Sequence, residues 1–226
     1  MKFRAVIFDL DGTLLDSLHG IAVTMNALLE QMGYPPHPLE KYRYFVGNGL
    51  RTMVSRALPG KWRHRFPEPE EKESRLDRLE KEYRNLYSEK WPLLTPPYRG
   101  VPELLETLSR QELKMAVLSN KTDVFTKRMV LELLPGCNFD MVLGARCGVP
   151  LKPDPGSALE IAAALSISPG EIIFLGDSGV DMQTGINAEM YPVGALWGFR
   201  DEDELLANGA KLLIKHPLEL MKIINP

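Results

Sequence analysis

Residues 1–20 read MKFRAVIFDLDGTLLDSLHG, and the apolar run Ala5–Phe8 with the two carboxylates that follow it decides the fold. Four consecutive apolar residues suit a strand that is covered on both faces, as in a parallel sheet. Because side chains alternate along a strand, Asp9 and Asp11 project the same way if the extended geometry continues. Adjacent carboxylates repel, so this pair needs a cation, a shared proton or two different tasks.

Strand and helix patterns alternate from about residue 100 onward. Short apolar runs predict further strands at Met115–Leu118, Phe139–Leu143, Ile172–Leu175 and Tyr191–Leu196. Helical spacing of apolar residues marks Val101–Ser109, Lys127–Leu134 and Pro155–Leu165. This alternation predicts an α/β fold with a parallel sheet and helices on both of its faces.

The stretch 17–94 interrupts the alternation and predicts an all-helical insert. Its helical patterns cover Ile21–Met32, Leu50–Leu58 and the charge-dense segment Glu68–Lys90. We expect two domains, a core made of residues 1–16 and 95–226 and a helical domain of residues 17–94, with the Pro-rich segment 95–100 as the return linker.

Composition narrows the classes of function. The chain has 226 residues, 44% of them hydrophobic, and a net charge of −3, which gives no basic field for nucleic acid or an anionic membrane. No apolar run reaches the ~18 residues of a membrane span, and no N-terminal signal pattern is visible. Cys137 and Cys147 are too few for a disulfide framework, so we expect reduced thiols in a cytoplasmic protein.

Polar side chains follow the other predicted strands as well. Ser119 and Asn120 come after the second strand, Lys152 lies in LKPDP, and Asp177 follows the strand IIFL, with Asp181 one helical turn beyond. Each also fits an ordinary turn, surface or N-cap residue when taken alone. The carboxyl ends of parallel strands share one edge, however, so these side chains should converge on Asp9.

The expected cluster combines oxygen ligands with anion-binding groups. Asp9, Asp11 and Asp177 supply carboxylates without cysteine or histidine, which favours a hard cation, best Mg²⁺. A metal beside a lysine and neutral donors makes a site for a phosphoryl group.

Four motifs, DLDGT (9–13), SN (119–120), the Lys-Pro of residues 152–153 and GDSGVD (176–181), resemble in this order those of the haloacid dehalogenase superfamily. The resemblance spans almost the whole chain. It implies a Rossmann-like, doubly wound parallel sheet with the helical insert as a cap domain. It also implies that Asp9 attacks phosphorus, that Asp11 protonates the leaving oxygen and later activates water, and that Thr13 orients Asp11. The presence of Asp11 favours phosphoester chemistry over dehalogenation.

The same resemblance assigns the remaining site residues. Ser119 and Lys152 would hold the phosphoryl oxygens, and Asn120 would line the site. Mg²⁺ would be bound by the side chains of Asp9 and Asp177 and by the backbone carbonyl of Asp11. Asp181 would support Lys152 or the waters of the metal.

Within the superfamily, four segments look like phosphoglycolate phosphatases: VGNGLRTMVSRAL (46–58), PYRGVPELLETL (97–108), VLSNK (117–121) and VGALWGFR (193–200). A small carboxylate would then meet backbone amides of the cap segment Gly47, Asn48 and Gly49, with Arg51 or Arg56 nearby. Arg56 fits an ordinary helix-surface residue equally well.

Two glutamates depart from this pattern. Glu112 and Glu189 stand where relatives often have glycine, and they put local packing in question rather than catalysis.

Three functions remain in competition at this stage. The first is a Mg²⁺-dependent phosphatase on a small phosphorylated metabolite, with 2-phosphoglycolate ahead of sugar phosphates, nucleotides and pyrophosphate. The second is a phosphomutase of the β-phosphoglucomutase type, and the third is a regulatory protein on an inactive scaffold. A monomer and a homodimer are both compatible with the sequence.

Overall fold

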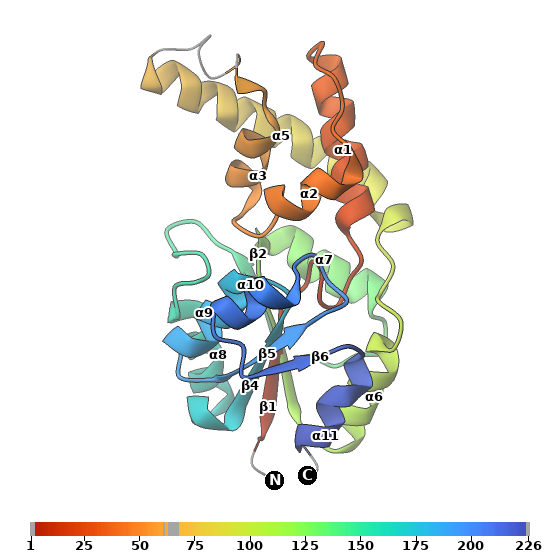
Figure 1. Cartoon of the computed structure of the whole chain (residues 1–226), viewed down its shortest axis with the longest axis vertical. Helices are drawn as coiled ribbons and strands as arrows, with labels where there is room; N and C mark the ends of the chain where they lie inside the picture. The colour runs from red at the N-terminus through yellow and green to blue at the C-terminus, as the bar shows by residue number, and fades with distance from the viewer. Residues whose placement is uncertain (1–2, 61, 63–67, 225–226) are drawn as a thin grey trace. The chain divides into compact units, whose positions relative to one another are not determined.

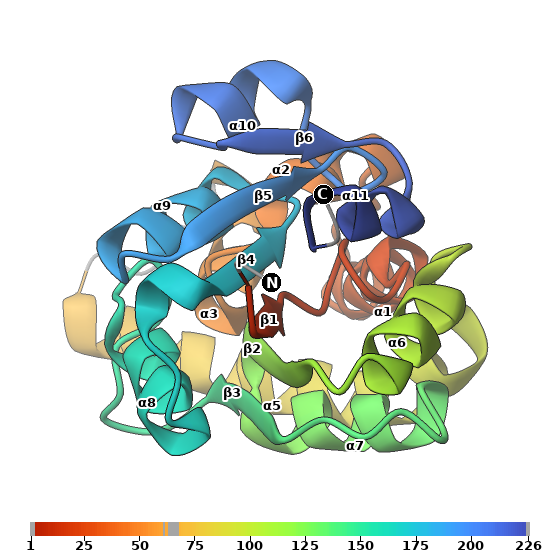
Figure 2. The ribbon, with the colours of Figure 1, turned by 90° about the horizontal axis from the view of Figure 1, so that it is seen from below.

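The computed structural model describes residues 3–60, 62 and 68–224. Six parallel strands form one sheet in the order β3-β2-β1-β4-β5-β6 (Figures 1 and 2). They are β1 (Ala5–Phe8), β2 (Lys114–Thr122), β3 (Met141–Ala145), β4 (Ile172–Gly176), β5 (Tyr191–Ala195) and β6 (Leu212–Ile214). The predicted α/β class and its five strands are confirmed, and the sixth strand is an addition.

The core of the sheet follows from the pleat. Ile7 of β1 is paired with Ala116 of β2 on one side and with Phe174 of β4 on the other. Because alternate residues share a face, these three side chains form one buried layer with neighbours two residues away along each strand. Helix α8 (Gly156–Leu165) packs Ile161 into this layer. The strands are therefore apolar in continuous runs, as a sheet covered on both faces requires.

Helices cover both faces of the sheet. Figure 2 shows α8 and α9 (Gly179–Asn187) on one side and α6 (Val101–Arg110) and α11 (Met221–Ile224) on the other. Helix α7 (Asp123–Leu133) contacts β2 and β3, and α10 (Glu202–Ala207) contacts α9. Short 3₁₀ segments occur at η1 (Pro169–Glu171) and η2 (Pro217–Leu220). The doubly wound arrangement expected from the resemblance is thus present.

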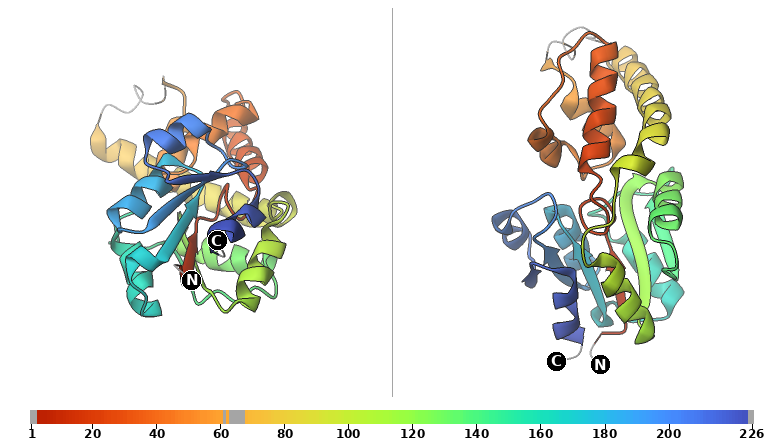
Figure 3. Two further views of the ribbon diagram at one scale, coloured as in Figure 1. Left: turned by 60° about the horizontal axis from the view of Figure 1, so that its bottom comes forward. Right: turned by 90° about the vertical axis from the view of Figure 1, so that its right-hand side faces the viewer.

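The helical insert forms a second compact unit. Contacts divide the chain into residues 1–16 with 97–226 and residues 17–96. Within the second unit, α1 (Leu18–Gln31) lies alongside α5 (Pro69–Leu94), and α3 (Leu50–Ala57) also contacts α5, while α2 (Leu39–Phe45) contacts α1 and α3 (Figure 3). Its described residues contain no strand.

Aromatic side chains build the interior of this unit. Tyr42, Tyr87 and Trp91 are fully buried, and the Tyr42 hydroxyl donates to Asn26 Oδ1 at 2.6 Å. Burial raises the pKa of Tyr42 above its ordinary value, so the phenol stays a hydrogen-bond donor.

None of the described helices is both long enough and apolar enough to cross a bilayer.

Candidate functional site

Asp9 lies at the carboxyl end of the central strand. Its backbone N–H donates to Leu175 O at 2.9 Å, so the ladder between β1 and β4 continues one residue past Phe8. Its side chain is buried, and Lys152 Nζ lies 2.7 Å from Asp9 Oδ1. The end of β1 thus places the Asp9 carboxylate in contact with the buried ammonium group of Lys152.

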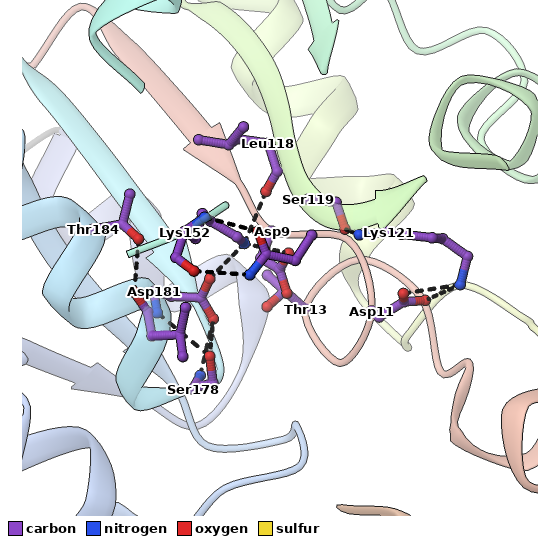
Figure 4. Close-up of polar contacts among 12 residues, drawn as sticks. Asp9, Asp11, Thr13, Leu118, Ser119, Lys121, Lys152, Ser178, Asp181 and Thr184 are labelled. Carbon is purple, nitrogen blue, oxygen red and sulfur yellow. Dashed lines mark hydrogen bonds and ion pairs between the residues drawn. The ribbon is translucent and has the colours of Figure 1, made fainter. Parts of the chain in front are cut away.

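Lys152 ties three segments together (Figure 4). Its Nζ donates to Asp9 Oδ1 at 2.7 Å, to Asp181 Oδ1 at 2.7 Å and to the Leu118 carbonyl at 3.0 Å. Three acceptors satisfy the three N–H donors of an ammonium group. The lysine predicted to converge on Asp9 therefore does so, and Asp181 supports it as the resemblance implied.

Asn120 holds the backbone of Lys152 through two hydrogen bonds. Lys152 N–H donates to Asn120 Oδ1 at 2.9 Å, and Asn120 Nδ2 donates to the Lys152 carbonyl at 3.1 Å. This paired contact fixes the lysine main chain from β2. Both Asn120 and the neighbouring Ser119 are buried, and Ser119 Oγ accepts from Lys121 N–H at 3.2 Å.

Asp11 has a separate partner. Lys121 Nζ lies 3.0 and 2.9 Å from the two carboxylate oxygens of Asp11, and both side chains are about one-tenth exposed, at 10% and 11%. Figure 4 shows this pair apart from the group around Lys152. The carboxylates of the DLDGT motif therefore lie in different environments, which suits different chemical tasks.

Asp177 is held by donors from two distant segments. Thr13 Oγ1 donates to Asp177 Oδ1 at 3.0 Å, and Phe199 N–H donates to Asp177 Oδ2 at 2.7 Å. The hydrogen bond of Thr13 thus goes to Asp177, whereas the resemblance implied that Thr13 orients Asp11. Gly12 has φ of +96°, so the chain turns after Asp11 and brings Thr13 Oγ1 to the carboxylate that follows β4.

Asp181 is fixed by the start of α9. Ser178 N–H and Ser178 Oγ donate to Asp181 Oδ2 at 3.1 and 2.6 Å, and Ser178 Oγ accepts from Asp181 N–H. This is a capping box, which ties the first helical turn to its own side chains. The other oxygen, Oδ1, remains directed at Lys152.

The buried carboxylates form one electrostatic unit. Asp9, Asp177 and Asp181 each place an oxygen within 4.8 Å of the others. Burial and the charge of Asp181 raise the pKa of Asp9 well above its usual range, although Lys152 opposes this. Burial and Asp181 likewise raise the pKa of Asp177 to about 7. Burial alone would lower the pKa of Lys152, but the charges of Asp181 and Asp9 outweigh it and raise the pKa.

These groups fit a hard divalent cation. When all three buried carboxylates are ionised, Lys152 supplies only one positive charge against them, so a bound cation would balance the excess negative charge. All three offer oxygen ligands, the type that Mg²⁺ prefers. Asp181 takes the third place in this group, whereas the side chain of Asp11, which the sequence grouped with the metal ligands, contacts Lys121.

The predicted specificity residues lie within the helical unit. Gly47 and Gly49 have φ of +113° and +84°, where glycine is favoured, and Asn48 lies between them just before α3. Arg51 binds Glu73, Asp77 and Glu80 of α5, and the hydrogen bonds that its guanidinium donates to Asp77 and Glu73 raise its pKa.

Arg56 has a different set of partners, also inside this unit. Its Nη1 donates to the carbonyls of Tyr44 and Phe45 at 3.0 and 3.3 Å. Both arginines thus have partners within the helical unit, and their proposed role toward a substrate stays a prediction.

Two contributors to the site were missed from the sequence. Lys121 ends the segment VLSNK, and its position two residues after Ser119 was the available signal. Phe199 contributes through its backbone N–H, which no residue type reveals.

The sequence is similar to a known family and to several known proteins. Residues 6–195 match the family of haloacid dehalogenase-like hydrolases. The chain is 31% identical over 218 residues to phosphoglycolate phosphatase 1 of Pseudomonas aeruginosa, covering 96% of this chain and 78% of that one. It is 29% identical over 226 residues to the N-acetylmuramic acid 6-phosphate phosphatase of the same organism, covering 100% of this chain and 96% of the relative.

A solved structure agrees with this placement. A protein from Lactobacillus delbrueckii subsp. bulgaricus superposes with a TM-score of 0.87 at 29% identity and 99% coverage of both chains. The family match extends from β1 to the end of β5 and so includes every strand that carries a site residue. The chain belongs to the haloacid dehalogenase-like hydrolases.

Proposed function

We propose that the protein is a Mg²⁺-dependent phosphatase that hydrolyses a small phosphomonoester through an aspartyl phosphate on Asp9. The observation that carries this proposal is the buried group of Asp9, Asp177, Asp181 and Lys152, with Asp11 held separately by Lys121. It supplies a nucleophile, a metal site and a second carboxylate for proton transfer within one strand-end edge.

The first half-reaction uses both aspartates of the DLDGT motif. An oxygen of Asp9 forms a bond to phosphorus while the bond from phosphorus to the substrate oxygen breaks. Asp11 gives its proton to that leaving oxygen, so an alcohol departs and Asp9 carries the phosphoryl group. In the second half-reaction Asp11 takes a proton from water, the resulting hydroxide oxygen bonds to phosphorus, and inorganic phosphate leaves Asp9 free.

The neighbouring groups bind and orient. Lys152 holds an oxygen of Asp9 at 2.7 Å and is placed to neutralise charge on a phosphoryl oxygen, and Ser119 offers a hydroxyl at the same edge. Asp9, Asp177 and the backbone carbonyl of Asp11 would hold Mg²⁺. When bound, the cation would supply a positive charge that offsets the repulsion between a phosphate dianion and the carboxylates.

Relatives support 2-phosphoglycolate as the substrate to test first. Phosphoglycolate phosphatases of Pseudomonas aeruginosa and Pseudomonas putida are 31% and 32% identical to this chain over nearly its full length. The relative named for N-acetylmuramic acid 6-phosphate, at 29% identity, supports a phosphorylated sugar acid as the second candidate. The segment Gly47–Gly49 with Arg51 and Arg56 is the region where we expect this choice to be made.

Phosphate release tests the proposal. Wild-type protein, Asp9→Asn and the control Asp16→Asn, an exposed aspartate in the same segment, would be assayed with Mg²⁺ and with EDTA. The substrates would be 2-phosphoglycolate, N-acetylmuramic acid 6-phosphate, glucose 6-phosphate, a nucleoside monophosphate and pyrophosphate. We expect Asp9→Asn to lower kcat by about 10³-fold or more, as removal of a covalent nucleophile does, and Asp16→Asn to leave it unchanged.

The pattern across substrates separates chemistry from specificity. Release that requires Mg²⁺ and Asp9 and is fastest with 2-phosphoglycolate supports the whole proposal. Metal-dependent release that is fastest with another compound keeps the mechanism and reassigns the substrate. Activity that survives Asp9→Asn contradicts the covalent mechanism.

A further inference from the structure

The segment Trp197–Phe199 reaches the metal-site carboxylate from the neighbouring strand. β4 and β5 are parallel with Gly176 opposite Gly194, so the chain that leaves β5 emerges beside the chain that leaves β4 (Figure 2). Asp177 is the first residue after β4, and Trp197 is the second residue after β5. Its residues take no part in bond making or proton transfer in the proposed phosphatase reaction.

Both oxygens of Asp177 are fixed, one of them by this segment. Phe199 N–H donates to Oδ2 at 2.7 Å, and Thr13 Oγ1 donates to Oδ1 at 3.0 Å. Asp177 is 1% exposed, so water contributes little to its orientation. A carboxylate has about four lone-pair positions, so each oxygen keeps capacity to bind a cation after accepting one hydrogen bond.

The same segment also fixes the second donor. Trp197 Nε1 donates to the Thr13 carbonyl at 3.0 Å, which ties the main chain of Thr13 to the loop after β5. Phe199 therefore holds one oxygen of Asp177 directly through its backbone N–H. Trp197 acts on the other oxygen indirectly, because its side chain holds Thr13, which donates to that oxygen.

Position 198 requires glycine because its main chain passes very close to Asp177 and Gly12. A Cβ at this position would lie 2.2 Å from Asp177 Cβ and 2.5 Å from both Asp177 Oδ2 and the Gly12 carbonyl. Such contacts are far inside van der Waals distance, so any side chain here would displace Asp177 or the loop that carries Thr13. Glycine lets the Phe199 N–H come within hydrogen-bond reach of the carboxylate.

We propose that Trp197–Phe199 is a positioning segment that holds Asp177 in its metal-binding orientation and thereby sets the affinity for Mg²⁺. The inference rests on the proposed function, because the cation is the one proposed there. A carboxylate held before binding loses less side-chain entropy when a cation arrives. Groups that orient metal ligands typically change metal affinity or activity by about 10–100-fold when they are mutated.

Mg²⁺ binding measured without substrate tests the inference. Wild-type protein, Gly198→Ala and Trp197→Phe would be titrated with MgCl₂ by isothermal calorimetry, with circular dichroism to verify folding. We expect Gly198→Ala to weaken binding by about 10–100-fold and Trp197→Phe, which loses one hydrogen bond, by about three- to tenfold. Gly170→Ala is the matched control, because a Cβ there meets no atom within 4 Å.

Kinetics at varied Mg²⁺ concentration distinguish a loss of metal affinity from a general loss of activity. In both variants the Mg²⁺ concentration for half-maximal phosphatase activity should rise, while kcat at saturating Mg²⁺ returns to within about threefold of wild type. Thr13→Val should also weaken Mg²⁺ binding, and Thr13→Ser, which keeps the donor to Asp177, should restore it.

The outcomes that overturn the inference are distinct from failure of the proposed function. Folded Gly198→Ala that binds Mg²⁺ within twofold of wild type overturns it. If Gly198→Ala does not fold, unchanged Mg²⁺ affinity of Trp197→Phe overturns it instead. If the wild-type protein itself takes up no Mg²⁺, the proposed function fails and the inference fails with it.

Discussion

The Lys121–Asp11 pair gives a fixed orientation to the carboxylate that we propose as the general acid. Lys121 Nζ contacts both oxygens of Asp11, at 3.0 and 2.9 Å, in a partly shielded position. Such a contact restrains rotation of the carboxylate better than a single hydrogen bond does. Misplacement of a proton donor by about 1 Å costs up to about 10²-fold in rate, so the pair belongs to the catalytic geometry under the proposed mechanism.

Substitution of Lys121 tests this assignment. We expect Lys121→Met, which keeps an unbranched side chain and removes its charge, to lower kcat by about 10–100-fold in protein that circular dichroism verifies as folded. Lys114→Met is the matched control, because Lys114 forms an exposed ion pair with Asp140 at 2.7 Å and should leave kcat unchanged. Steady-state kinetics on the best substrate gives the comparison. Equal kcat in Lys121→Met and wild type would show that Asp11 needs no partner.

The sequence reveals a site residue well when its side-chain chemistry marks it, and poorly when its role depends on how the folded backbone places it. Asp9, Lys152 and Asp177 were expected to converge because parallel strands end at one edge, and the structure places Asp9 and Asp177 in one cluster with Asp181. Lys121 lies where the register between β2 and β3 shifts, between Leu118 and Thr122, and composition does not encode such an irregularity.

At the level of elements, two helices end with glutamate in a conformation that favours glycine. Glu112 and Glu189 have φ of +56° and +57° and follow the last turns of α6 and α9. Glu112 N–H donates to Ser109 O and Leu113 N–H to Leu108 O, which is the paired hydrogen bonding of a Schellman motif. The same pattern joins Glu189 to Ile186 and Met190 to Gly185. Both are positions at which the family resemblance of the sequence implied glycine.

Glycine at these positions should stabilise the protein. The left-handed conformation costs a side-chain-bearing residue about 1–2 kcal/mol, and the greater freedom of glycine in the unfolded chain offsets about 0.5–1 kcal/mol of the gain. Glu112→Gly and Glu189→Gly should therefore each raise the free energy of unfolding by about 0.5–1 kcal/mol, as measured by urea denaturation. Glu106→Gly in the middle of α6 should lower it by about 1 kcal/mol. Destabilisation by all three substitutions would contradict the strain argument.

Element boundaries show where sequence patterns lose information. Strand β1 was predicted with its exact bounds, because four apolar residues stand between polar neighbours. Strand β6 (Leu212–Ile214) has three residues and was missed, since a run that short becomes a strand only through its pairing with β5. Helix α5 continues to Leu94 and includes Pro92, beyond the predicted end at Lys90.

For the molecule as a whole, the strand order explains why the site forms around Asp9. β1 lies between β2 and β4, so the chain leaves β1 toward one half of the sheet and later returns to the other half. Ligands of open α/β sheets bind at such a switch point, outside the carboxyl ends of the strands. The sequence predicted parallel strands but gave no order for them, because order depends on long-range packing rather than on local pattern.

The buried carboxylates of the core unit make the free energy of unfolding depend on pH and on bound metal. Burial and Asp181 raise the pKa of Asp177 to about 7, so the folded protein holds a proton that the unfolded chain has lost above about pH 4. A group with a raised folded pKa makes the free energy of unfolding fall as pH rises through that interval. Without metal, the protein should therefore be less stable at about pH 8 than at about pH 5.5 as far as this group is concerned.

Thermal unfolding in Mg²⁺ and in EDTA tests this linkage. Because the cation binds ionised carboxylates of the folded state, millimolar Mg²⁺ should raise Tm by about 3 °C or more at about pH 8 and by less at about pH 5.5, where protons compete. Asp177→Asn should be more stable than wild type in EDTA at the higher pH and should lose the Mg²⁺ increment, since the amide removes both the charge and the ligand. Asp16→Asn, at an exposed aspartate, should behave as wild type. An equal Mg²⁺ increment in wild type and Asp177→Asn at both pH values would mean that the cation stabilises the protein from a different site.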